Sequence, residues 1–282
     1  MHLCRISRYI KIFFLNPKIF FKKFLGHILL KVVPSPKGFI RINIGGHFID
    51  TLPSRNDWWK SMYLGYCGVE TAHSLNKYLN SGGIFIDVGA GIGYFSAIAS
   101  DIVDTSGQVH CFEPNPFNIK VIQKMIKSNP NSNIVLNDYA LGAQDAVCNY
   151  YIQRLKRVTK CSMIYSLIER IDETIEVRTR RLDNYLEQKN IDRVSLVKID
   201  VEGYEYYVLK GLSGFLKRTS SKPPIICEIL ASAYKNLDFC LEELYDYMKS
   251  YGYEAHNIFN PRIRVDIRTL RENVDVLFLT KH

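Results

Sequence analysis

Short apolar runs recur along most of the chain, and between them lie segments in which apolar residues return every three or four positions. The runs are continuous instead of alternating, which is typical of parallel strands covered on both faces. They occupy residues 84–89, 108–113, 133–138, 195–200, 224–230 and 274–280. The helical segments are 69–79, 93–103, 116–128, 204–218 and 238–252. Strand-helix alternation of this kind predicts right-handed crossovers and an α/β fold with a doubly wound, mostly parallel sheet.

Two segments depart from this rhythm. Residues 38–51 alternate apolar and polar positions around Gly45-Gly46, a pattern typical of a β-hairpin with a two-residue turn. Residues 143–181 fall between the third and fourth strands, and we expect extra strands at 147–152 and 175–181. This insertion is rich in Arg and Lys, so it either covers a binding site or forms a solvated hairpin, and both alternatives remain open.

The first 35 residues form a basic, apolar arm, distinct from the body of the chain at 36–282. Lysines interrupt its apolar runs, so no stretch of about 18 to 20 uncharged residues exists to span a bilayer. It also lacks the apolar core and small-residue cleavage site of a secretory signal. Asn16 as cap and Pro17 at the first helical position predict the start of a helix.

This predicted helix is amphipathic. The residues that share its apolar face are Phe21, Phe24, Leu25 and Ile28, and the lysines away from that face are Lys18, Lys22 and Lys23. Such a helix either attaches to a membrane surface or packs its apolar face on the body and leaves its lysines in water. The sequence leaves both alternatives open.

Charge and cysteine content narrow the class of protein. The chain of 282 residues has a net charge of +9, but residues 1–41 hold nine of its 37 basic residues and none of its 28 acidic ones. The body is therefore neutral, which argues against a groove that tracks nucleic-acid phosphates. The seven cysteines have no metal-like spacing, so we expect reduced thiols and a cytoplasmic location.

Acidic side chains stand at the ends of five predicted strands. In an open α/β sheet, ligands bind beyond the carboxyl ends of the strands, near the point where the strand order reverses. The acids at these ends are Asp87, Glu113, Asp138, Asp200 and Glu228. Such a cluster would repel a pyrophosphate, whereas a cationic ligand would be attracted to it.

The segment GGIFIDVGAGIGYFS, residues 82–96, is rich in glycine after the first strand. Gly89, Gly91 and Gly93 are spaced two apart, unlike the G-x-G-x-x-G of a dinucleotide loop, and no phosphate-loop lysine follows them. The loop therefore favours a ligand with an amino group and a sulfonium over one with phosphates. Glu113 ends the second strand, where a carboxylate can accept hydrogen bonds from both ribose hydroxyls.

The sequence resembles class I S-adenosylmethionine-dependent methyltransferases and, within that fold, the FkbM family. The segments that carry the resemblance are FIDVGAGIGYFS, VHCFEPNP, NDYALG, RLDNYL, VSLVKIDVEGYEYYVLKGL and IICEIL, over about residues 66–232. The resemblance implies a Rossmann-like, seven-stranded sheet with the N-terminal helix and hairpin as an extension. It also implies O-methylation of a hydroxyl, in members that act on natural products or sugars.

The resemblance further implies residues that bind the cofactor, S-adenosyl-L-methionine. Those expected at its methionine part are Asp87, Gly89, Ala90, Gly91 and Gly93, with Asp87 on the amino group. Those expected at its ribose are Glu113 and either Asn115 or Pro114. Those expected beside its adenine are Asp138 and Tyr139.

The expected catalytic residues are Asp200, Glu202 and Glu228. Asp200 or Glu202 would take the proton of the acceptor hydroxyl, because a carboxylate within hydrogen-bond reach is a sufficient base. His256 is a further candidate base. We expect no bound metal, with the alternative that the three carboxylates hold Mg²⁺ to orient the hydroxyl.

The expected function is methyl transfer from S-adenosylmethionine to a hydroxyl of a saccharide, glycolipid or natural product. Contact of residues 1–35 with a membrane would place the enzyme at the inner membrane face. The alternative is a protein that keeps the fold, has lost catalysis and serves as a membrane-surface or glycan-assembly partner. No nucleic-acid acceptor is expected, because no NPPY-type motif occurs and the body is charge-balanced.

Overall fold

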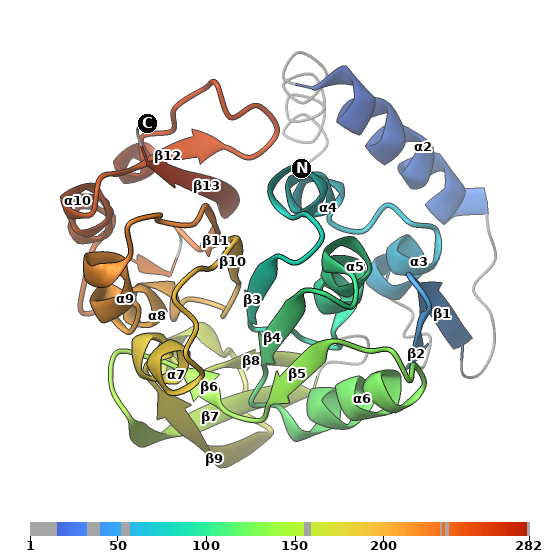
Figure 1. Cartoon of the computed structure of the whole chain (residues 1–282), viewed down its shortest axis with the longest axis horizontal. Helices are drawn as coiled ribbons and strands as arrows, with labels where there is room; N and C mark the ends of the chain where they lie inside the picture. Colours follow the sequence, from blue (N-terminus) through green and yellow to red (C-terminus); the bar gives the residue numbers. More distant parts are fainter. Residues whose placement is uncertain are drawn as a thin grey trace.

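A computed structural model gives the fold of the chain (Figure 1). It describes residues 16–32, 40–51, 57–154, 159–231, 233–234 and 237–280. A seven-stranded sheet in the order β12-β13-β11-β10-β3-β4-β5 forms its centre. Its strands are β3 (Ile84–Val88), β4 (Gln108–Phe112), β5 (Ile134–Asn137), β10 (Leu196–Ile199), β11 (Ile225–Ile229), β12 (Tyr253–Asn257) and β13 (Val274–Thr280). Only β13 runs antiparallel to its neighbours in this sheet, which confirms the predicted doubly wound, mostly parallel α/β fold.

The strand order reverses between β3 and β10. The chain adds β4 and β5 on one side of β3 and then crosses to β10 on the other side. Such a reversal opens a crevice at the carboxyl ends of the strands, where ligands bind in doubly wound folds. In the register of the sheet, Asp87 of β3 lies beside Lys198 of β10 at this point.

Helices cover both faces of the sheet. One face carries α4 (Val69–Tyr78), α5 (Tyr94–Val103) and α6 (Pro116–Lys127), and the other carries α7 (Leu182–Gln188), α8 (Glu205–Lys210), α9 (Ser213–Arg218) and α10 (Leu241–Ser250). Because strand side chains alternate between faces, Phe85 packs in the core under the first set and Ile86 in the core under the second. Both cores are continuous across the strands that hold the candidate site.

The helix predicted over 204–218 is wrong as a single element, since the structure has α8 and α9 with a break between them. The carbonyl of Gly211 accepts the backbone N–H of Asp183 at 2.9 Å, and Asp183 Oδ2 accepts the N–H of Gly214 at 2.8 Å. These bonds to a distant residue replace helical bonds at the break. The sequence prediction also missed α3 (Asp57–Tyr63) and α7, whose seven residues give too few turns for a clear period.

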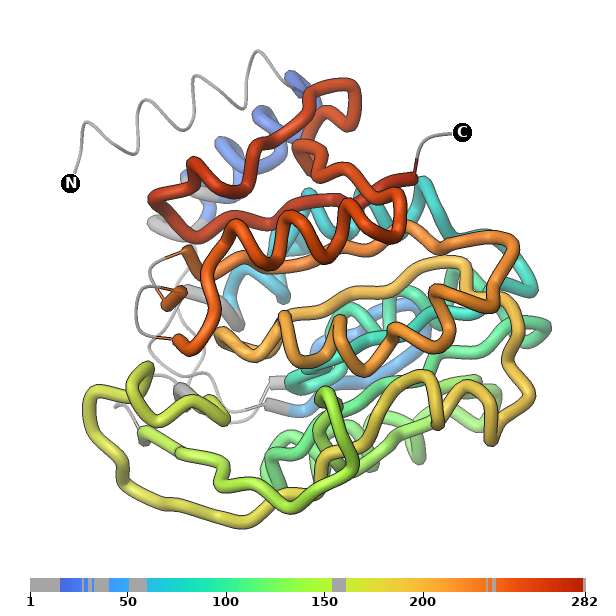
Figure 2. The backbone as a smooth tube through the Cα atoms, turned by 90° about the vertical axis from the view of Figure 1, so that its left-hand side faces the viewer, coloured from blue at the N-terminus to red at the C-terminus, as the bar shows by residue number. Residues whose placement is uncertain are grey.

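The insertion forms a second, four-stranded sheet in the order β6-β9-β7-β8. Its strands are β6 (Ala140–Leu141), β7 (Ala146–Arg154), β8 (Thr159–Ser162) and β9 (Glu173–Arg180), with a 3₁₀ turn, η1 (Tyr165–Leu167), before β9. Figure 2 shows this sheet at the opposite end of the molecule from β12 and β13. The two predicted extra strands are confirmed as β7 and β9, and they pair with each other instead of extending the main sheet.

The predicted hairpin is confirmed as β1 (Ile40–Ile44) and β2 (His47–Thr51). Its turn residues, Gly45 and Gly46, have φ of 52° and 80°. A two-residue turn with positive φ at both positions matches the twist of the paired strands, and glycine adopts it without strain.

The arm contributes helix α2 (Pro17–Val32), and its start is as predicted: Asn16 Oδ1 accepts the N–H of Ile19 at 3.2 Å. Ile19, 4% exposed, faces the body, whereas the predicted apolar face points away from it. The exposed side chains on that face are Phe21, Phe24, Leu25 and Ile28. The alternative in which α2 packs this face on the body is therefore wrong.

The boundary expected at residue 35 lies outside the described residues. Among the helices that the structure describes, none combines the length and apolar character needed to cross a membrane. Cys111 in β4 and Cys227 in β11 are fully buried and free, in line with the expected reduced thiols.

Candidate active site

The glycine loop leads from β3 into α5 in a tight turn. The N–H groups of Gly89 and Ala90 both donate to the carbonyl of Phe112, at 3.0 and 3.1 Å, and the N–H of Gly93 donates to Ala90 at 2.9 Å. Gly89, Gly91 and Gly93 all have positive φ, at 74°, 58° and 84°. Residues with a side chain rarely adopt a positive φ, so the backbone conformation of the loop favours glycine at all three positions.

The three glycines differ in what surrounds them. A Cβ added at Gly89 would lie 1.9 Å from the carbonyl oxygen of Asp200, and one at Gly93 would lie 2.8 Å from Cε of Met125. A Cβ at Gly91 would meet nothing within 4 Å. Gly89 and Gly93 therefore permit close packing within the protein. Gly91 borders open space, where part of a ligand can lie directly against the protein backbone.

Glu113 lies directly after β4 and is 3% exposed. Its Oε2 accepts the N–H of Gly91 at 2.8 Å, and its Oε1 accepts the N–H of Asn115 at 2.9 Å. Burial raises the pKa of Glu113 to about 7. The side chain of Asn118 also donates to this carboxylate. The carboxylate is therefore fixed beside the open side of the glycine loop and can accept further hydrogen bonds at its remaining positions.

Asn115 caps α6 and links the loop after β4 to the insertion. Its Oδ1 accepts the N–H of Phe117 at 2.9 Å, and its Nδ2 lies 3.2 Å from Sγ of Cys161 in β8. The next residue, Ser162, donates from Oγ to the carbonyl of Glu202 at 2.9 Å. The insertion therefore packs one side on the loops after β4 and β10, while alternate residues of β9 on its other side are exposed to solvent.

Asp138 and Tyr139 follow the end of β5. Asp138 is exposed, whereas the ring of Tyr139 packs edge-on against Phe112 at 5.7 Å between centroids. The Tyr139 hydroxyl donates to Asn137 Oδ1 at 3.4 Å, and the guanidinium of Arg180 lies 5.4 Å from the ring centroid. Their place beside an adenine stays a prediction.

Asp87 is fully buried at the crevice between β3 and β10. Its Oδ2 accepts the hydroxyl of Ser96 at 2.6 Å, while its Oδ1 has no hydrogen-bond partner and lies 3.6 Å from Nζ of Lys198. Burial raises the pKa of Asp87, and Lys198 and Ser96 oppose that shift. A buried carboxylate oxygen without a hydrogen bond is costly, so Oδ1 is suited to accept one from the ammonium group of a ligand.

Lys198 pairs with both Asp87 and Asp200. Its Nζ lies 3.1 Å from Oδ2 of Asp200, and its side chain is 5% exposed. Burial disfavours the ammonium form, but the carboxylates of Asp200 and Asp87 outweigh this and raise the pKa of Lys198. Lys198 therefore neutralises part of the negative charge that the sequence placed at the strand ends.

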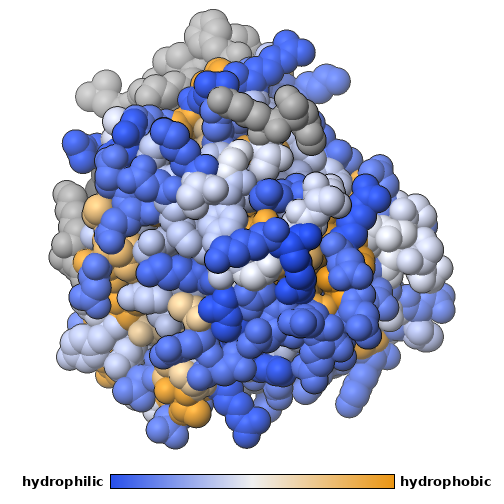
Figure 3. Space-filling view, turned by 60° about the vertical axis from the view of Figure 1, so that its left-hand side comes forward, coloured by the Kyte–Doolittle hydropathy of each residue, from blue (hydrophilic) through white to orange (hydrophobic). Residues whose placement is uncertain are grey.

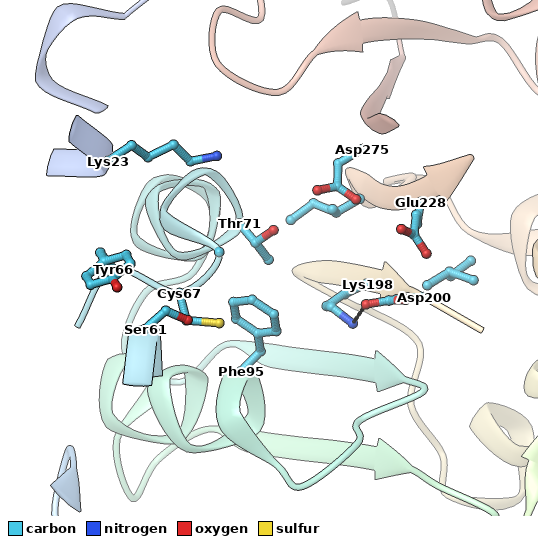
Figure 4. A pocket seen from close by; sticks show the side chains of 13 residues that line it. Lys23, Ser61, Tyr66, Cys67, Thr71, Phe95, Lys198, Asp200, Glu228 and Asp275 are labelled. Atoms are coloured by element: carbon cyan, nitrogen blue, oxygen red, sulfur yellow. Dashed lines mark hydrogen bonds and ion pairs between the residues drawn. The ribbon is translucent and has the colours of Figure 1, made fainter. Parts of the chain in front are cut away.

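A cavity of about 380 Å³ lies beside the ends of β10 and β11, on the face covered by α4 and α5 (Figure 4). The carboxyl groups of Asp200, Glu228 and Asp275 line it, as do Lys198 and the ring of Phe95. Lys23 reaches it from α2. None of the glycine-loop residues lines this cavity, which therefore offers a place for a second molecule next to the loop.

The carboxyl groups in the cavity lie in different surroundings. Burial and the neighbouring carboxylate of Asp200 raise the pKa of Glu228 to about 10 and that of Asp275 to about 6. This direction favours the protonated form of Glu228, which can donate a hydrogen bond. The Asp200 side chain is 40% exposed and forms an ion pair with Lys198.

The structure brings two of the three expected catalytic residues together. Asp200 and Glu228 line the cavity, but Glu202 does not. Glu202 lies on the following turn with φ of 53°, an uncommon value for a residue with a side chain. His256 does not line the cavity either, and its Nδ1 lies 2.7 Å from the carbonyl of Pro261.

The metal alternative has no support in the geometry. Within the described part of the chain, no three His, Cys, Asp or Glu side chains form a group that could hold a metal ion. Positive charge beside Asp200 comes instead from the ammonium group of Lys198.

Sequence reasoning missed three charged residues of the site: Lys198, Asp275 and Lys23. Lys198 had a usable signal, because residues two apart on a strand share a face, so Lys198 had to lie on the same side as Asp200. Asp275 lies opposite Glu228 only through the antiparallel register of β11 and β13, which the sequence does not reveal.

Comparisons with known proteins agree on one class of enzyme. The family model described as the methyltransferase FkbM domain matches residues 87–255, more than half of the chain. Methyltransferase 1 of Beauveria bassiana is 29% identical over 144 residues, which are 45% of this chain and 57% of that protein. The chain therefore matches little more than half the length of this relative.

Solved structures also resemble the chain. A methyltransferase FkbM from Methylobacillus flagellatus is 18% identical with a TM-score of 0.45, covering 80% of this chain and 56% of that one. The fibrillarin of Aeropyrum pernix, determined with natively bound S-adenosyl-L-methionine, is 12% identical with a TM-score of 0.41, covering 74% and 73%.

Proposed function

The chain belongs to the FkbM family of methyltransferases, and on that premise we propose that it methylates a hydroxyl oxygen of a saccharide, glycolipid or natural product. It is a methyltransferase that depends on S-adenosylmethionine. The observation that carries the choice of a hydroxyl is the presence in one cavity of two different carboxyl groups: Asp200, which forms an ion pair with Lys198, and Glu228, whose pKa is raised by burial. A hydroxyl needs both a proton acceptor and a hydrogen-bond donor to orient it.

The residues around the glycine loop fit the cofactor. S-adenosylmethionine supplies, when bound, a methyl group on a positively charged sulfur. Asp87 would accept a hydrogen bond from the ammonium group of the cofactor, and Glu113 would accept hydrogen bonds from its ribose hydroxyls. The open side of Gly91 would leave room for the methionine part. The insertion, through Cys161 and Ser162, would hold the surrounding loops in place.

Asp200 is our choice of general base. Its carboxylate is exposed to the cavity, and Gly89 packs directly on its carbonyl, so the base and the glycine loop are fixed relative to each other. Orienting the reactants contributes about 7 to 11 kcal/mol in well-placed systems. A positioned base adds about a hundredfold to ten-thousandfold in rate.

The experiment is to incubate the protein with methyl-labelled cofactor and fractionated cell extract. We expect label in a saccharide or lipid-linked fraction, as an ether that survives mild base. The same fraction with its hydroxyls acetylated beforehand should accept no label. Label that mild base releases as methanol would indicate a carboxyl ester and overturn the proposal.

A protein that retained only the fold is the other candidate function. It would bind no S-adenosylmethionine, which calorimetry with the wild type and Asp87→Ala would reveal. The geometry of Gly91 and Glu113 favours an intact cofactor site, so we expect binding by the wild type and loss in the variant.

A further inference from the structure

Helix α2 turns an apolar face to the solvent. Five of the ten large apolar side chains that are exposed in the described part of the chain lie on this helix. They are Phe21, Phe24, Leu25, Ile28 and Val32, each between 43% and 68% exposed. At 100° per residue they occupy one continuous arc, which a helix of a soluble domain normally buries.

Contacts on the opposite side of α2 hold this orientation. Ile19 is buried beside Val69, and Nδ2 of Asn16 donates to the carbonyl of Phe259 at 3.3 Å. Nζ of Lys23 lies 2.8 Å from Oε1 of Glu70, with both side chains mostly buried. The exposed arc is therefore fixed by the packing of the other side and has no room to rotate inward.

The arc is bordered by positive charge. Lys18 and Lys22 are exposed next to it, and residues 1–41 contain nine basic residues and no acidic one. An apolar stripe with lysines along one edge is complementary to anionic lipid headgroups over acyl chains. By contrast, the face in Figure 3, which brings forward the left-hand side of Figure 1, is mostly hydrophilic with small separate apolar patches.

The buried side of the same helix reaches the acceptor cavity. Lys23 lines the cavity together with Asp275 and Glu228 (Figure 4). An α-helix with its side chains is about 10 to 12 Å across, so a surface in contact with the exposed arc would lie within one helix diameter of Lys23. A molecule anchored in that surface could place its head group in the cavity.

We propose that α2 docks the enzyme on an anionic lipid bilayer through Phe21, Phe24, Leu25, Ile28 and Val32, and that the methyl acceptor is a hydroxyl-bearing head group anchored in that bilayer. The second part rests on the proposed function, since it names the class of acceptor for the same cavity. The first part stands on the surface of α2 alone.

The docking test is flotation of the full chain with lipid vesicles. Wild-type protein should float with vesicles of phosphatidylcholine and phosphatidylglycerol in equal parts, and much less with phosphatidylcholine alone or at raised salt. The variant Phe24→Ser/Leu25→Ser/Ile28→Ser should lower the bound fraction by about tenfold or more. The matched control Val147→Ser/Tyr165→Ser/Ile263→Ser changes three large side chains elsewhere that are 42% to 65% exposed, and it should float like the wild type.

Equal flotation of the α2 variant and the wild type would overturn the docking. So would self-association without vesicles that the α2 variant abolishes, because the arc would then bind a second copy of the chain. Cofactor affinity measured by calorimetry shows that each variant is folded, and Lys18→Glu/Lys22→Glu tests the charge without altering the arc.

The acceptor test uses the labelled cofactor with membranes of the source cells. Label should enter the organic-solvent extract, and the α2 variant should lose most of it while binding the cofactor as the wild type does. Label confined to soluble molecules at wild-type levels in the α2 variant would overturn the lipid-anchored acceptor but leave methyl transfer intact. Vesicle binding with no methyl transfer to any fraction would instead overturn the proposed function.

Discussion

Nζ of Lys198 lies 3.1 Å from Oδ2 of Asp200, and this ion pair joins the two halves of the candidate site. On its other side Lys198 approaches the buried carboxylate of Asp87 at 3.6 Å. The lysine thus lies between the residue expected at the cofactor's amino group and the residue proposed as base. The single positive charge of Lys198 stabilises the negative charge of both carboxylates.

Replacing Lys198 with Met should destabilise the protein strongly. Breaking a buried ion pair from one side leaves an uncompensated charge and costs about 3 to 5 kcal/mol of unfolding free energy. Urea unfolding measures this. Lys120→Met, at an exposed position on α6, is the control and should change the free energy by less than about 0.5 kcal/mol. A similar, small loss in both variants would show that Asp87 and Asp200 do not need the lysine.

The glycine loop predicts two different outcomes for the same substitution. Gly89→Ala should destabilise the fold, because its Cβ would overlap the carbonyl of Asp200. Gly91→Ala meets no atom within 4 Å and should cost only the strain of a positive φ, about 1 to 3 kcal/mol. Thermal unfolding and cofactor calorimetry separate them: Gly91→Ala should stay folded and lose cofactor affinity. Full affinity in Gly91→Ala would place the cofactor elsewhere.

Glu113→Gln should weaken cofactor binding by about tenfold to a hundredfold, since hydrogen bonds to a charged group contribute about 1.5 to 3 kcal/mol. The glutamine amide has only one oxygen, so its NH₂ group would face the backbone N–H of either Gly91 or Asn115. Two donors cannot bond to each other, and the loop therefore loses one hydrogen bond. Calorimetry with S-adenosylmethionine measures the effect. Asp192→Asn, at an exposed side chain outside the candidate site, is the comparison and should have a much smaller effect. Equal losses would mean that the ribose is not held at Glu113.

The protein should become less stable as pH rises from about 5 to 8. Burial raises the pKa of Glu205 from 4.5 to about 8, so the folded chain holds this proton after the unfolded chain has released it. The free energy of unfolding then falls with pH across this window, by at most about 1.4 kcal/mol per pH unit for one group. Glu113 and Asp275, with pKa values of about 7 and 6, act in the same direction.

Glu205→Gln should make the free energy of unfolding less dependent on pH, because glutamine does not titrate and the folded chain no longer holds this extra proton. Urea unfolding at several pH values gives the slope. Glu187→Gln, at a side chain 76% exposed, is the control and should keep the wild-type slope. A slope unchanged in Glu205→Gln would mean that its carboxyl is ionised in the folded chain.

Asp200→Asn and Glu228→Gln should separate the two carboxyl roles. We expect Asp200→Asn to lower kcat by about a hundredfold to ten-thousandfold through loss of the base. Glu228→Gln should retain most activity, because the protonated acid and the amide both donate a hydrogen bond. Methyl transfer from labelled cofactor measures kcat, with cofactor affinity as the control for folding. Near wild-type kcat in Asp200→Asn would move the base to Glu202.

Local patterns in the sequence predicted much of the fold. Six strands of the main sheet, the hairpin at Gly45-Gly46 and the helix start at Asn16 were all recognisable. Each depends on residues close together in the chain: an apolar run, a turn that needs positive φ, or a cap that binds an N–H three residues on. The glycine loop could be predicted for the same reason, because the need for glycine comes from the positive φ of the loop residues themselves.

The break between α8 and α9 shows where local patterns fail. The apolar period continues through 204–218, but the carbonyl of Gly211 bonds to Asp183 instead of the next turn. No helical period contains that information, because the competing donor comes from another part of the chain.

The sequence by itself determined which residues end the strands and that a glycine loop stands among acidic groups. Only the tertiary structure decided that Lys198 neutralises two of those acids, that Asp275 faces Glu228, and that α2 turns its apolar arc outward. The physical reason is that charge compensation and burial depend on strand register and helix orientation. Those are set by packing between segments far apart in the chain, not by the residues adjacent to each position.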